Sequence, residues 1–266
     1  MDAIDLTKII KSKNPRLAKW LPRFAIRAFE RLICLKRINY IIENYGDLPP
    51  LEFIEQTLRY IEVDYTLHGE ELIDPQQRYI FASNHPLGGV DGMILSLLLS
   101  RFAPYGFKFV VNDILTNITP VAPIMVPVNK HGRQSGDYVR AHREMYFGRG
   151  QVFTFPAGLC SRLIDSRVQD TPWRNTFVQK ARESDRQVVP VHVSALNSRS
   201  FYRWALWRKR LGIKANIEMI LLPREMFAQR GKHIDVYLGE PLTIDDSMTT
   251  AQWVSTIRER SYSLPR

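Results

Sequence analysis

Short apolar runs alternate with amphipathic stretches along most of this chain. The runs with the length and composition of buried strands are residues 63–68, 79–82, 107–111, 124–128, 152–155, 188–193, 217–222 and 234–238. Helices are expected at residues 51–60, 137–147 and 173–183, and after the turn at residues 83–89 an apolar helix runs through Leu99. This alternation predicts an α/β fold, a single domain with a mostly parallel central sheet flanked by helices. Pro190, inside the run 188–193, is typical of an edge strand or a bulge.

The first part of the chain has a different pattern, because residues 16–45 form basic amphipathic helices. Apolar side chains recur at roughly helical spacing on one face, namely Trp20, Phe24, Phe29, Leu32 and Ile33. The other face carries Lys19, Arg23, Arg27, Arg31, Lys36 and Arg37. Two interpretations remain open: an anchor at a membrane interface, or helices packed on the domain with a solvated basic face. We therefore divide the chain into a helical N-terminal region, residues 1–60, and an α/β domain, residues 61–266.

The net positive charge of the chain indicates an anionic partner. The formal net charge is +10 and the isoelectric point is about 9.7, so the protein is expected to meet a polyanion, either nucleic acid or an anionic bilayer. Residues 198–214 form a second basic and aromatic block, with Trp204 and Trp207 close together. The chain has only two cysteines, which favours a reducing compartment. We expect neither a secretory signal nor a membrane span, since the longest apolar run is far shorter than the ~18 residues that a span needs.

The stretch YIFASNHPLGGVDGMILSLLLS, residues 79–100, carries the strongest chemical signal. His85 follows the apolar strand, and Asp91 falls in the first turn of the next helix, so both lie at the carboxyl end of a strand. A neutral imidazole is a natural general base, and a carboxylate on its second nitrogen fixes the tautomer. No GxSxG elbow supplies a serine nucleophile, so the base would activate the hydroxyl of a substrate. The alternative is a structural histidine in a turn, beside an aspartate that caps a helix.

Two other strand ends carry polar groups. The segment VFTFPAGLCSR, residues 152–162, places Gly158 where backbone can approach a ligand and Arg162 where a guanidinium can hold an anion. The segment IMVPVNKHGR, residues 124–133, brings Lys130 and Arg133 after a strand, although a solvated basic loop explains them equally well. Cys160 is expected to be a packing residue rather than a nucleophile, because no neighbour in the sequence lowers its pKa.

Taken in order, NH…D, a basic turn, FPxG and VPV resemble the lysophospholipid acyltransferase superfamily, the relatives of bacterial 1-acylglycerol-3-phosphate O-acyltransferase. The resemblance extends roughly from Tyr60 to Leu242 and makes residues 61–266 an acyltransferase domain. It implies transfer of an acyl group from a thioester, on acyl carrier protein or coenzyme A, to a hydroxyl of a membrane-resident lyso-lipid. It further implies that His85 is the base, that Asp91 orients it, and that backbone amides of the glycine-rich turns hold the oxyanion.

The resemblance also implies a set of substrate contacts and a place of action. The residues expected to contact substrate are Asn84, Gly88, Gly89, Lys130, Arg133, Phe155, Pro156, Gly158, Ser161, Arg162 and Arg174. No metal or other cofactor is expected, because acyl-ACP or acyl-CoA is a co-substrate. The enzyme would act as a peripheral protein on the cytoplasmic face of the inner membrane, with residues 16–45 and 198–214 docked on anionic lipid.

The sequence departs from the family pattern at two places. Five residues, rather than four, separate His85 from Asp91 in this HxxxxD-like motif, and Gly88 and Gly89 are expected to absorb the extra one. Ala157 replaces the usual glutamate of FPEG, which indicates a changed head-group site. The variant pattern NHPLGGVDG, FPAGLCSR and TPWRNTFVQKA resembles the hemolysin-like branch, which is similar to the O-acyltransferases that finish ornithine and glycine lipids.

The preferred acceptor is therefore a lyso-aminolipid with a 3-hydroxyacyl chain, and the first alternative is a lysophospholipid such as 1-acylglycerol-3-phosphate. A hydrolase that uses His85 and water is a further alternative. The alternative from another class is a basic nucleic-acid-binding protein. No nucleic-acid motif supports that alternative and it leaves the His85–Asp91 pair unexplained, so no nucleic-acid partner is expected.

Overall fold

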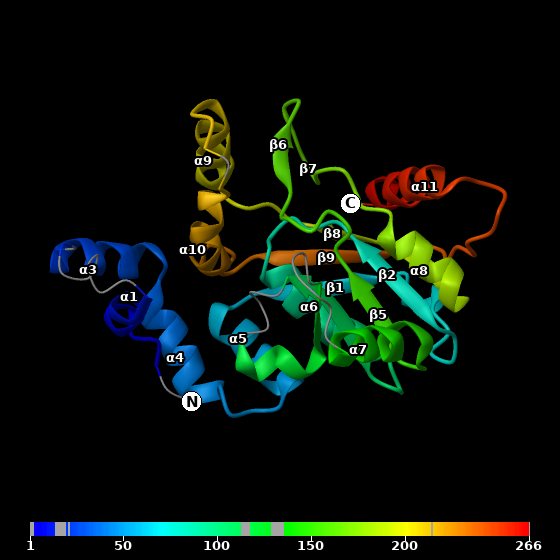
Figure 1. Cartoon of the computed structure of the whole chain (residues 1–266), viewed down its shortest axis with the longest axis horizontal. Coiled ribbons are helices and arrows are strands. Elements are labelled where there is room, and N and C mark those ends of the chain that lie inside the picture. The colour runs from blue at the N-terminus through cyan, green and yellow to red at the C-terminus, as the bar shows by residue number, and fades with distance from the viewer. Residues whose placement is uncertain are drawn as a thin grey trace.

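A seven-stranded sheet forms the centre of the molecule and helices cover both of its faces (Figure 1). The structure, a computed structural model, describes residues 3–13, 20, 22–112, 118–128, 136–213 and 215–265. The strand order is β1-β9-β8-β2-β5-β3-β4, and a separate hairpin is formed by β6 and β7. All neighbouring strands of the sheet are parallel except β8 and β9. The predicted α/β fold with a mostly parallel sheet is confirmed.

The strands of the large sheet are β1 (Asp64–His68), β2 (Tyr79–Ser83), β3 (Phe107–Asn112), β4 (Met125–Val128), β5 (Gln151–Thr154), β8 (Gln187–Ser194) and β9 (His233–Leu238). The hairpin strands are β6 (Arg162–Ile164) and β7 (Arg167–Gln169). The helices are α1 (Leu6–Lys13), α3 (Arg23–Leu32), α4 (Leu35–Tyr45), α5 (Pro50–Ile61), α6 (Val90–Ser100), α7 (Gly136–Phe147), α8 (Thr176–Ser184), α9 (Arg199–Arg210), α10 (Leu222–Phe227) and α11 (Thr250–Ser263). Short 3-10 turns are η1 (Glu70–Leu72), η3 (Thr119–Ile124) and η4 (Ile217–Leu221).

The sheet separates two hydrophobic cores because successive side chains of a strand point to opposite faces. In β2, Phe81 packs into the core that contains α5 and α6, whereas Ile80 and Ala82 pack into the core that contains α7, α8 and α11. Both faces of β2 are therefore apolar, and all five of its residues are buried. A strand that is covered on both faces requires a continuous apolar run, and this is why the sequence pattern predicts β2.

The carboxyl ends of β2, β5, β3 and β8 lie at one edge of the sheet, since these strands run in the same direction. The loops that follow β2 and β5 are neighbours there because Ala82 is paired with Thr154. Open parallel sheets place their binding sites at this edge. The turn that contains His85 and the turn of the FPAG segment thus come together through strand pairing alone.

The strand predicted at residues 217–222 is wrong. Residues 217–222 form η4 and the start of α10, rather than a strand. In this run Glu218 and Leu221 are buried while Ile217 and Ile220 are exposed, a spacing of three that suits a helical turn.

Strand β8, for which Pro190 predicts an edge position or a bulge, lies inside the sheet between β9 and β2. The pairing shifts by one residue at Pro190, from Val191 with Leu238 to Val188 with Leu242, as in a bulge. The carbonyl of Pro190 accepts from the Gly239 N–H, one residue beyond the last pair of the β8–β9 ladder, Val191 with Leu238. The missing N–H of the proline therefore falls outside that ladder, and no interior hydrogen bond is lost.

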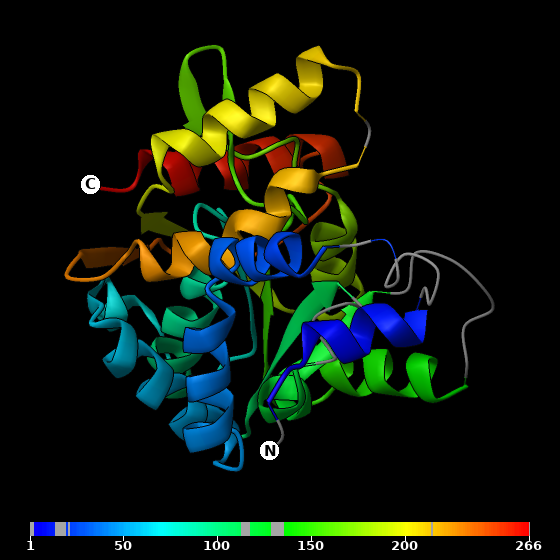
Figure 2. The same ribbon diagram turned by 90° about the vertical axis from the view of Figure 1, so that its left-hand side faces the viewer.

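The N-terminal helices pack along one side of the domain, the side that faces the viewer in Figure 2. Ile41 of α4 and Ile54 of α5 are buried in the same core as β2. Farther out, Trp20 and Phe24 are exposed to solvent, as are the basic side chains of α3. The division at residue 60 stays a prediction. In the part of the chain that the structure describes, no helix combines the length and the apolar character needed to cross a membrane.

Candidate active site

His85 and Asp91 form a hydrogen-bonded pair at the carboxyl end of β2. The His85 Nδ1 atom lies 3.0 Å from the Asp91 Oδ2 atom, and the histidine side chain keeps 14% of its surface exposed while the aspartate is fully buried. A carboxylate accepts only, so Nδ1 carries the proton in this pair. Among the described residues no group bonds to Nε2, which is therefore the ring nitrogen that can accept a proton.

Asp91 is held as an anion by its surroundings. Its Oδ2 atom also accepts from the N–H groups of Leu87 at 2.9 Å and Gly88 at 3.3 Å, and its Oδ1 atom accepts from the Gly92 N–H at 2.9 Å. Burial alone would raise the pKa of Asp91. The charge and hydrogen bond of His85 and the N–H groups of Leu87 and Gly92 outweigh that effect, so its pKa lies below the ordinary value. A carboxylate of this kind fixes the orientation of the imidazole and stabilises its charged form.

The turn between the two residues depends on Gly88. Its φ of +88° lies in the left-handed region, which residues with a Cβ atom rarely adopt. A Cβ atom at this position would also lie 2.9 Å from the Cys160 Sγ atom. The extra residue between His85 and Asp91 is thus absorbed by a turn that only glycine fits, and the hydrogen bond of the pair is kept.

Buried groups hold the main chain of His85 on both sides. Its N–H donates to the Asp170 Oδ1 atom at 3.2 Å, and its carbonyl accepts from the Ser161 N–H at 2.7 Å. The imidazole stacks on Phe155, with ring centroids 3.8 Å apart. Just before it, the Asn84 side chain both donates to the Val193 carbonyl and accepts from the Val193 N–H. The main chain of residues 84 and 85 is therefore held by the segments that follow β5 and β7 and by β8 itself.

A cavity of about 1550 Å³ opens beside the imidazole. One wall is built from apolar side chains of α4, α5 and α6, namely Ile38, Ile41, Ile42, Phe53, Ile54 and Met93. Phe155, Pro156 and Gly158 lie beside His85 on the lining. This volume exceeds the ~300–1,000 Å³ of ordinary small-molecule sites and its wall is apolar, so it suits long hydrocarbon chains.

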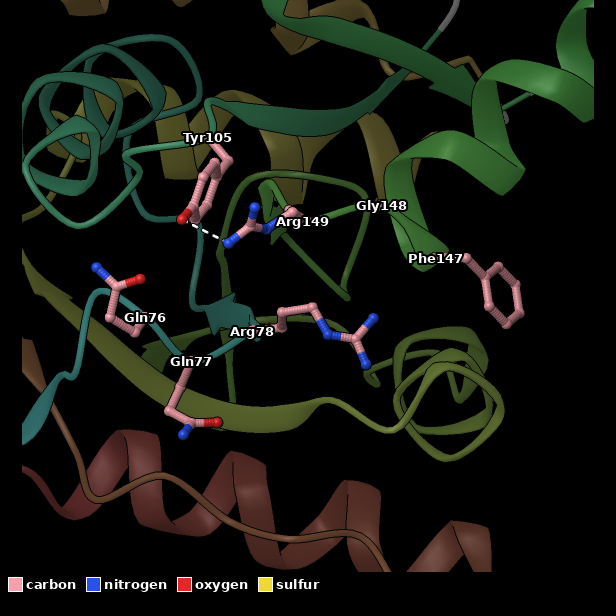
Figure 3. A pocket seen from close by; sticks show the side chains of 7 residues that line it. All are labelled: Gln76, Gln77, Arg78, Tyr105, Phe147, Gly148 and Arg149. Atoms are coloured by element: carbon pink, nitrogen blue, oxygen red, sulfur yellow. Dashed lines mark hydrogen bonds between the residues drawn. The ribbon is translucent and has the colours of Figure 1, made fainter.

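A second, smaller cavity of about 350 Å³ lies at the opposite edge of the sheet (Figure 3). It is lined by Gln76, Gln77, Arg78, Tyr105, Phe147, Gly148 and Arg149. Arg149 donates to the Tyr105 hydroxyl and stacks on its ring, and Arg78 donates to the Ser184 carbonyl. Both guanidinium groups are thus engaged, and the cavity holds no group suited to take a proton from a substrate. Across the described residues there is also no cluster of three histidine, cysteine or acidic side chains placed to hold a metal ion.

Comparison with known proteins decides the family. Residues 8–264 match the acyltransferase family. Over 264 residues the chain is 36% identical to the lyso-glycine lipid O-acyltransferase of Bacteroides thetaiotaomicron, covering 98% of this chain and 97% of that protein. It is 34% identical to the lyso-glycine lipid O-acyltransferase of Phocaeicola vulgatus, covering 98% and 95%. The chain belongs to the acyltransferase family.

Among solved structures, the crystal structure of the 1-acyl-sn-glycerophosphate acyltransferase from Thermotoga maritima is similar, with a TM-score of 0.47 and 13% identity over 89% of this chain and 90% of that one. The family predicted from the sequence motifs is confirmed, and with it acyl transfer as the type of reaction.

The structure of this acyltransferase brings together part of the predicted site. The predicted residues that line the large cavity are His85, Gly88, Gly89, Phe155, Pro156, Gly158 and Arg174. Asn84 and Ser161 are buried behind the loop and hold the main chain in place. Lys130 and Arg133 lie outside the described residues. The predicted substrate contacts at these positions stay predictions, except where the geometry assigns another role.

Arg162 is such an exception. Its guanidinium is buried and donates to the Glu218 Oε1 atom at 3.0 Å and to the Cys160 carbonyl at 2.8 Å. A guanidinium already paired with a buried carboxylate has no free fork with which to hold the head group of a lipid. In this acyltransferase Arg162 therefore ties the loop after β5 to η4, and it is not placed to bind substrate.

The geometry bears on two further expectations, the oxyanion site and the role of Cys160. The N–H groups of Leu87 and Gly88 donate to Asp91, and the Gly158 N–H donates to the Phe155 carbonyl, so these three amides are already committed. An oxyanion site at the other amides of the glycine-rich turns, such as that of Gly89, stays a prediction. Cys160 is a packing residue, as predicted. Burial and the neighbouring Asp91 charge raise the pKa of its thiol to about 12, so it is not a thiolate at neutral pH.

Sequence reasoning missed Asp170. This buried carboxylate accepts from the His85 N–H and, at 2.6 Å, from the Ser161 hydroxyl through one oxygen, and from the Trp173 indole N–H at 2.8 Å through the other. Asp170 lies three residues before Trp173, and the residues around it form no recognisable motif. Asp170 reaches His85 because the β6–β7 hairpin brings it back beside Ser161, which itself bonds to His85.

Replacing Asp170 by asparagine is expected to lower kcat by roughly 10- to 100-fold with little change in KM, because a small displacement of the base is costly. The asparagine NH₂ must face one of three donors. The double variant Asp170→Asn/Trp173→Phe removes one of those donors and is expected to recover part of the loss. Steady-state kinetics of the three variants measure this, and no recovery in the double variant would contradict the positioning role.

The same substitution has a signed effect on stability. Burial raises the pKa of Asp170, although the donors from Ser161, Trp173 and the His85 N–H oppose this. The folded state therefore binds the proton more tightly than the unfolded state. Asp170 thus makes the free energy of unfolding fall as the pH rises from about 4 through the raised pKa. Asp170→Asn is expected to flatten that part of the curve in denaturant titrations at stepped pH.

Proposed function

We propose that this acyltransferase moves a fatty acyl group from an acyl thioester to the hydroxyl of a lyso-aminolipid, in the synthesis of ornithine- or glycine-type membrane lipids. The observation that carries the proposal is the identity of 36% over nearly the full length to a protein named lyso-glycine lipid O-acyltransferase. The large cavity beside His85 supports it, since its apolar wall suits both the acyl chain and the chain of the acceptor.

The proposed step is direct transfer. His85 Nε2 takes the proton of the acceptor hydroxyl while its oxygen bonds to the thioester carbonyl carbon. The carbon–sulfur bond then breaks, and the imidazolium returns its proton to the departing thiolate. Asp91 keeps the ring in the required tautomer and stabilises its transient charge. Either acyl carrier protein or coenzyme A supplies the thioester in this proposal, and no further cofactor takes part.

Arg174 is the proposed contact for the head group of the acceptor. It lines the cavity beside Gly158, and a Cβ atom built on Gly158 would lie 3.9 Å from the Arg174 Cζ atom. Its side chain is exposed, and among the described residues it forms no ion pair with an acid. A glycine- or ornithine-type head group ends in a carboxylate, which a guanidinium binds in a two-pronged geometry. Ala157, in place of the usual glutamate, leaves this anion without a repelling neighbour in the same turn.

A competition between acceptors tests the proposal. With one radiolabelled acyl thioester, lyso-glycine lipid is expected to be acylated at least tenfold more efficiently than lysophosphatidic acid, in kcat/KM. Product lipids are separated by thin-layer chromatography, and free fatty acid is measured without acceptor to detect a hydrolase. A clear preference for lysophosphatidic acid would contradict the proposed acceptor. Release of free fatty acid alone would contradict acyl transfer.

A pair of arginine variants sharpens the same experiment. Arg174→Gln is expected to raise KM for the lyso-aminolipid about tenfold, because a charge-assisted contact is worth ~1.5–3 kcal/mol. Arg143→Gln is the matched control, since Arg143 is also exposed and lines the same cavity from α7. An equal effect in the two variants would mean that Arg174 acts only through general charge.

We further infer that the enzyme works as a peripheral protein on the cytoplasmic face of the inner membrane. Its proposed acceptor is a membrane lipid, and Trp20 and Phe24 are exposed among the basic side chains of α3. Amphipathic helices of this composition bind anionic bilayers through their apolar face and their positive charge.

A further inference from the structure

The outer face of α9 is both apolar and aromatic. Trp204, Trp207 and Leu211 are 57%, 61% and 68% exposed, and their spacing of three and four places them on one face. Single exposed apolar residues are ordinary on a protein surface, whereas a contiguous group marks an interaction site. Tryptophan is also the residue that prefers the interface between water and lipid.

The charge of this helix has a single sign. Arg199, Arg203, Lys209 and Arg210 are exposed, and α9 contains no acidic residue. At helical spacing Arg203 and Arg210 lie beside the tryptophan face. The acid of the following turn, Glu218, is buried and therefore does not offset them. The exposed face is thus complementary to an anionic surface.

Buried contacts fix this orientation of α9. Its inner face buries Phe201, Tyr202 and Ala205. The Glu218 carboxylate lies 3.0 Å from Arg162 and 2.7 Å from Arg208, so a buried ion-pair cluster joins α9, η4 and the start of β6. The tryptophans are therefore exposed because the opposite face of the helix is tightly packed.

Residues that follow α9 in the chain line the large cavity. Asn216, Met219, Leu222, Pro223 and Met226, from η4 and α10, form one part of the lining, and Ile38, Ile41 and Ile42 of α4 form another. Figures 1 and 2 place α9 and α3 on the same side of the molecule. Exposed aromatic and basic side chains thus occur on both α3 and α9, with lining residues of the cavity on the elements that follow each of them.

We propose that the outer face of α9, defined by Trp204, Trp207, Leu211, Arg203 and Arg210, is a second membrane-docking surface that binds anionic lipid. Together with α3 it would seat the molecule with the cavity mouth on the bilayer. The inference rests on the proposed function in one respect: docking would serve to deliver a lipid acceptor to His85. The binding itself can be measured without any substrate.

The test uses the full chain and sucrose-loaded vesicles of phosphatidylglycerol and phosphatidylcholine. Trp204→Ala/Trp207→Ala is expected to lower the partition coefficient at least tenfold. Tyr105→Ala is the control, because Tyr105 is a 45% exposed aromatic residue in the small cavity at the opposite edge of the sheet (Figure 3). Arg203→Gln/Arg210→Gln is expected to weaken binding and to reduce its dependence on salt, whereas Arg149→Gln is not.

Kinetics separate this inference from the proposed function. The double tryptophan variant is expected to lose acyl transfer to acceptor presented in vesicles and to keep transfer to acceptor dispersed in detergent micelles. If no acceptor is acylated by any variant, the proposed function fails while the vesicle result still stands. Unchanged vesicle binding in the double tryptophan variant would overturn the inference. So would retained vesicle binding combined with lost binding to acyl carrier protein, because α9 would then be a surface for that acidic protein.

Discussion

Replacing His85 by alanine is expected to lower kcat for acyl transfer by at least about 10³-fold, because the substitution removes the proposed general base. Nε2 of His85 has no hydrogen-bond partner among the described residues, and the ring packs by stacking on Phe155. The fold should therefore survive. Turnover with radiolabelled thioester and thermal unfolding of the same sample measure the two effects.

The chain supplies a matched control in a second histidine–aspartate pair. His68 Nε2 lies 2.8 Å from Asp235 Oδ1, on β1 and β9 at the far side of the sheet, where both side chains are exposed. His68→Ala is expected to leave kcat within about twofold of the wild type, as surface substitutions usually do. If His85→Ala retained comparable activity, the mechanism would be abandoned.

Asp91→Asn is the second large effect, with an expected loss of roughly 10²- to 10⁴-fold in kcat. The carboxylate accepts from the His85 ring and from the N–H groups of Leu87, Gly88 and Gly92. An asparagine NH₂ placed among these donors favours the wrong tautomer of the ring or leaves a donor unpaired. Asp235→Asn is the matched control, and a loss of less than tenfold in Asp91→Asn would contradict the role of Asp91.

The stability of Asp91→Asn has a pH signature opposite to that of Asp170→Asn. The pKa of Asp91 is lower in the folded state than the ordinary 3.8. Its stabilising contribution is therefore fully present above about pH 5 and is lost as the pH falls through the folded-state pKa. The difference in unfolding free energy between wild type and Asp91→Asn should therefore shrink as the pH falls below about 5.

The parts of the predicted arrangement that the structure reproduces are local in the chain. Strand, histidine, glycine turn and aspartate follow one another within residues 79–91, and each acts on its neighbours through short-range sterics and hydrogen bonds. The strand β2 was visible because it is covered on both faces and hence apolar throughout. The turn expected at Gly88 and Gly89 is present between His85 and Asp91, with the φ of Gly88 in the left-handed region.

The parts that the sequence did not predict depend on contacts between distant segments. The residues near Arg162 in the chain do not indicate that Glu218 forms an ion pair with it. They also do not indicate whether the arginine is exposed or buried. Asp170 is invisible for the same reason, since its partner His85 is 85 residues away. The apolar run at residues 217–222 was mistaken for a strand because a short run of this kind carries no period of its own.

The hydrogen bonds that hold the main chain of His85 have a consequence for when activity arises during translation of the chain. The pair itself joins residues only six apart, so it needs little of the chain. Ser161, Asp170 and, through Asn84, Val193 must all be in place before the ring is aimed at the cavity. A ribosome-bound chain shorter than about residue 193 would thus carry the dyad but remain inert, which delays esterification until most of the polypeptide has emerged.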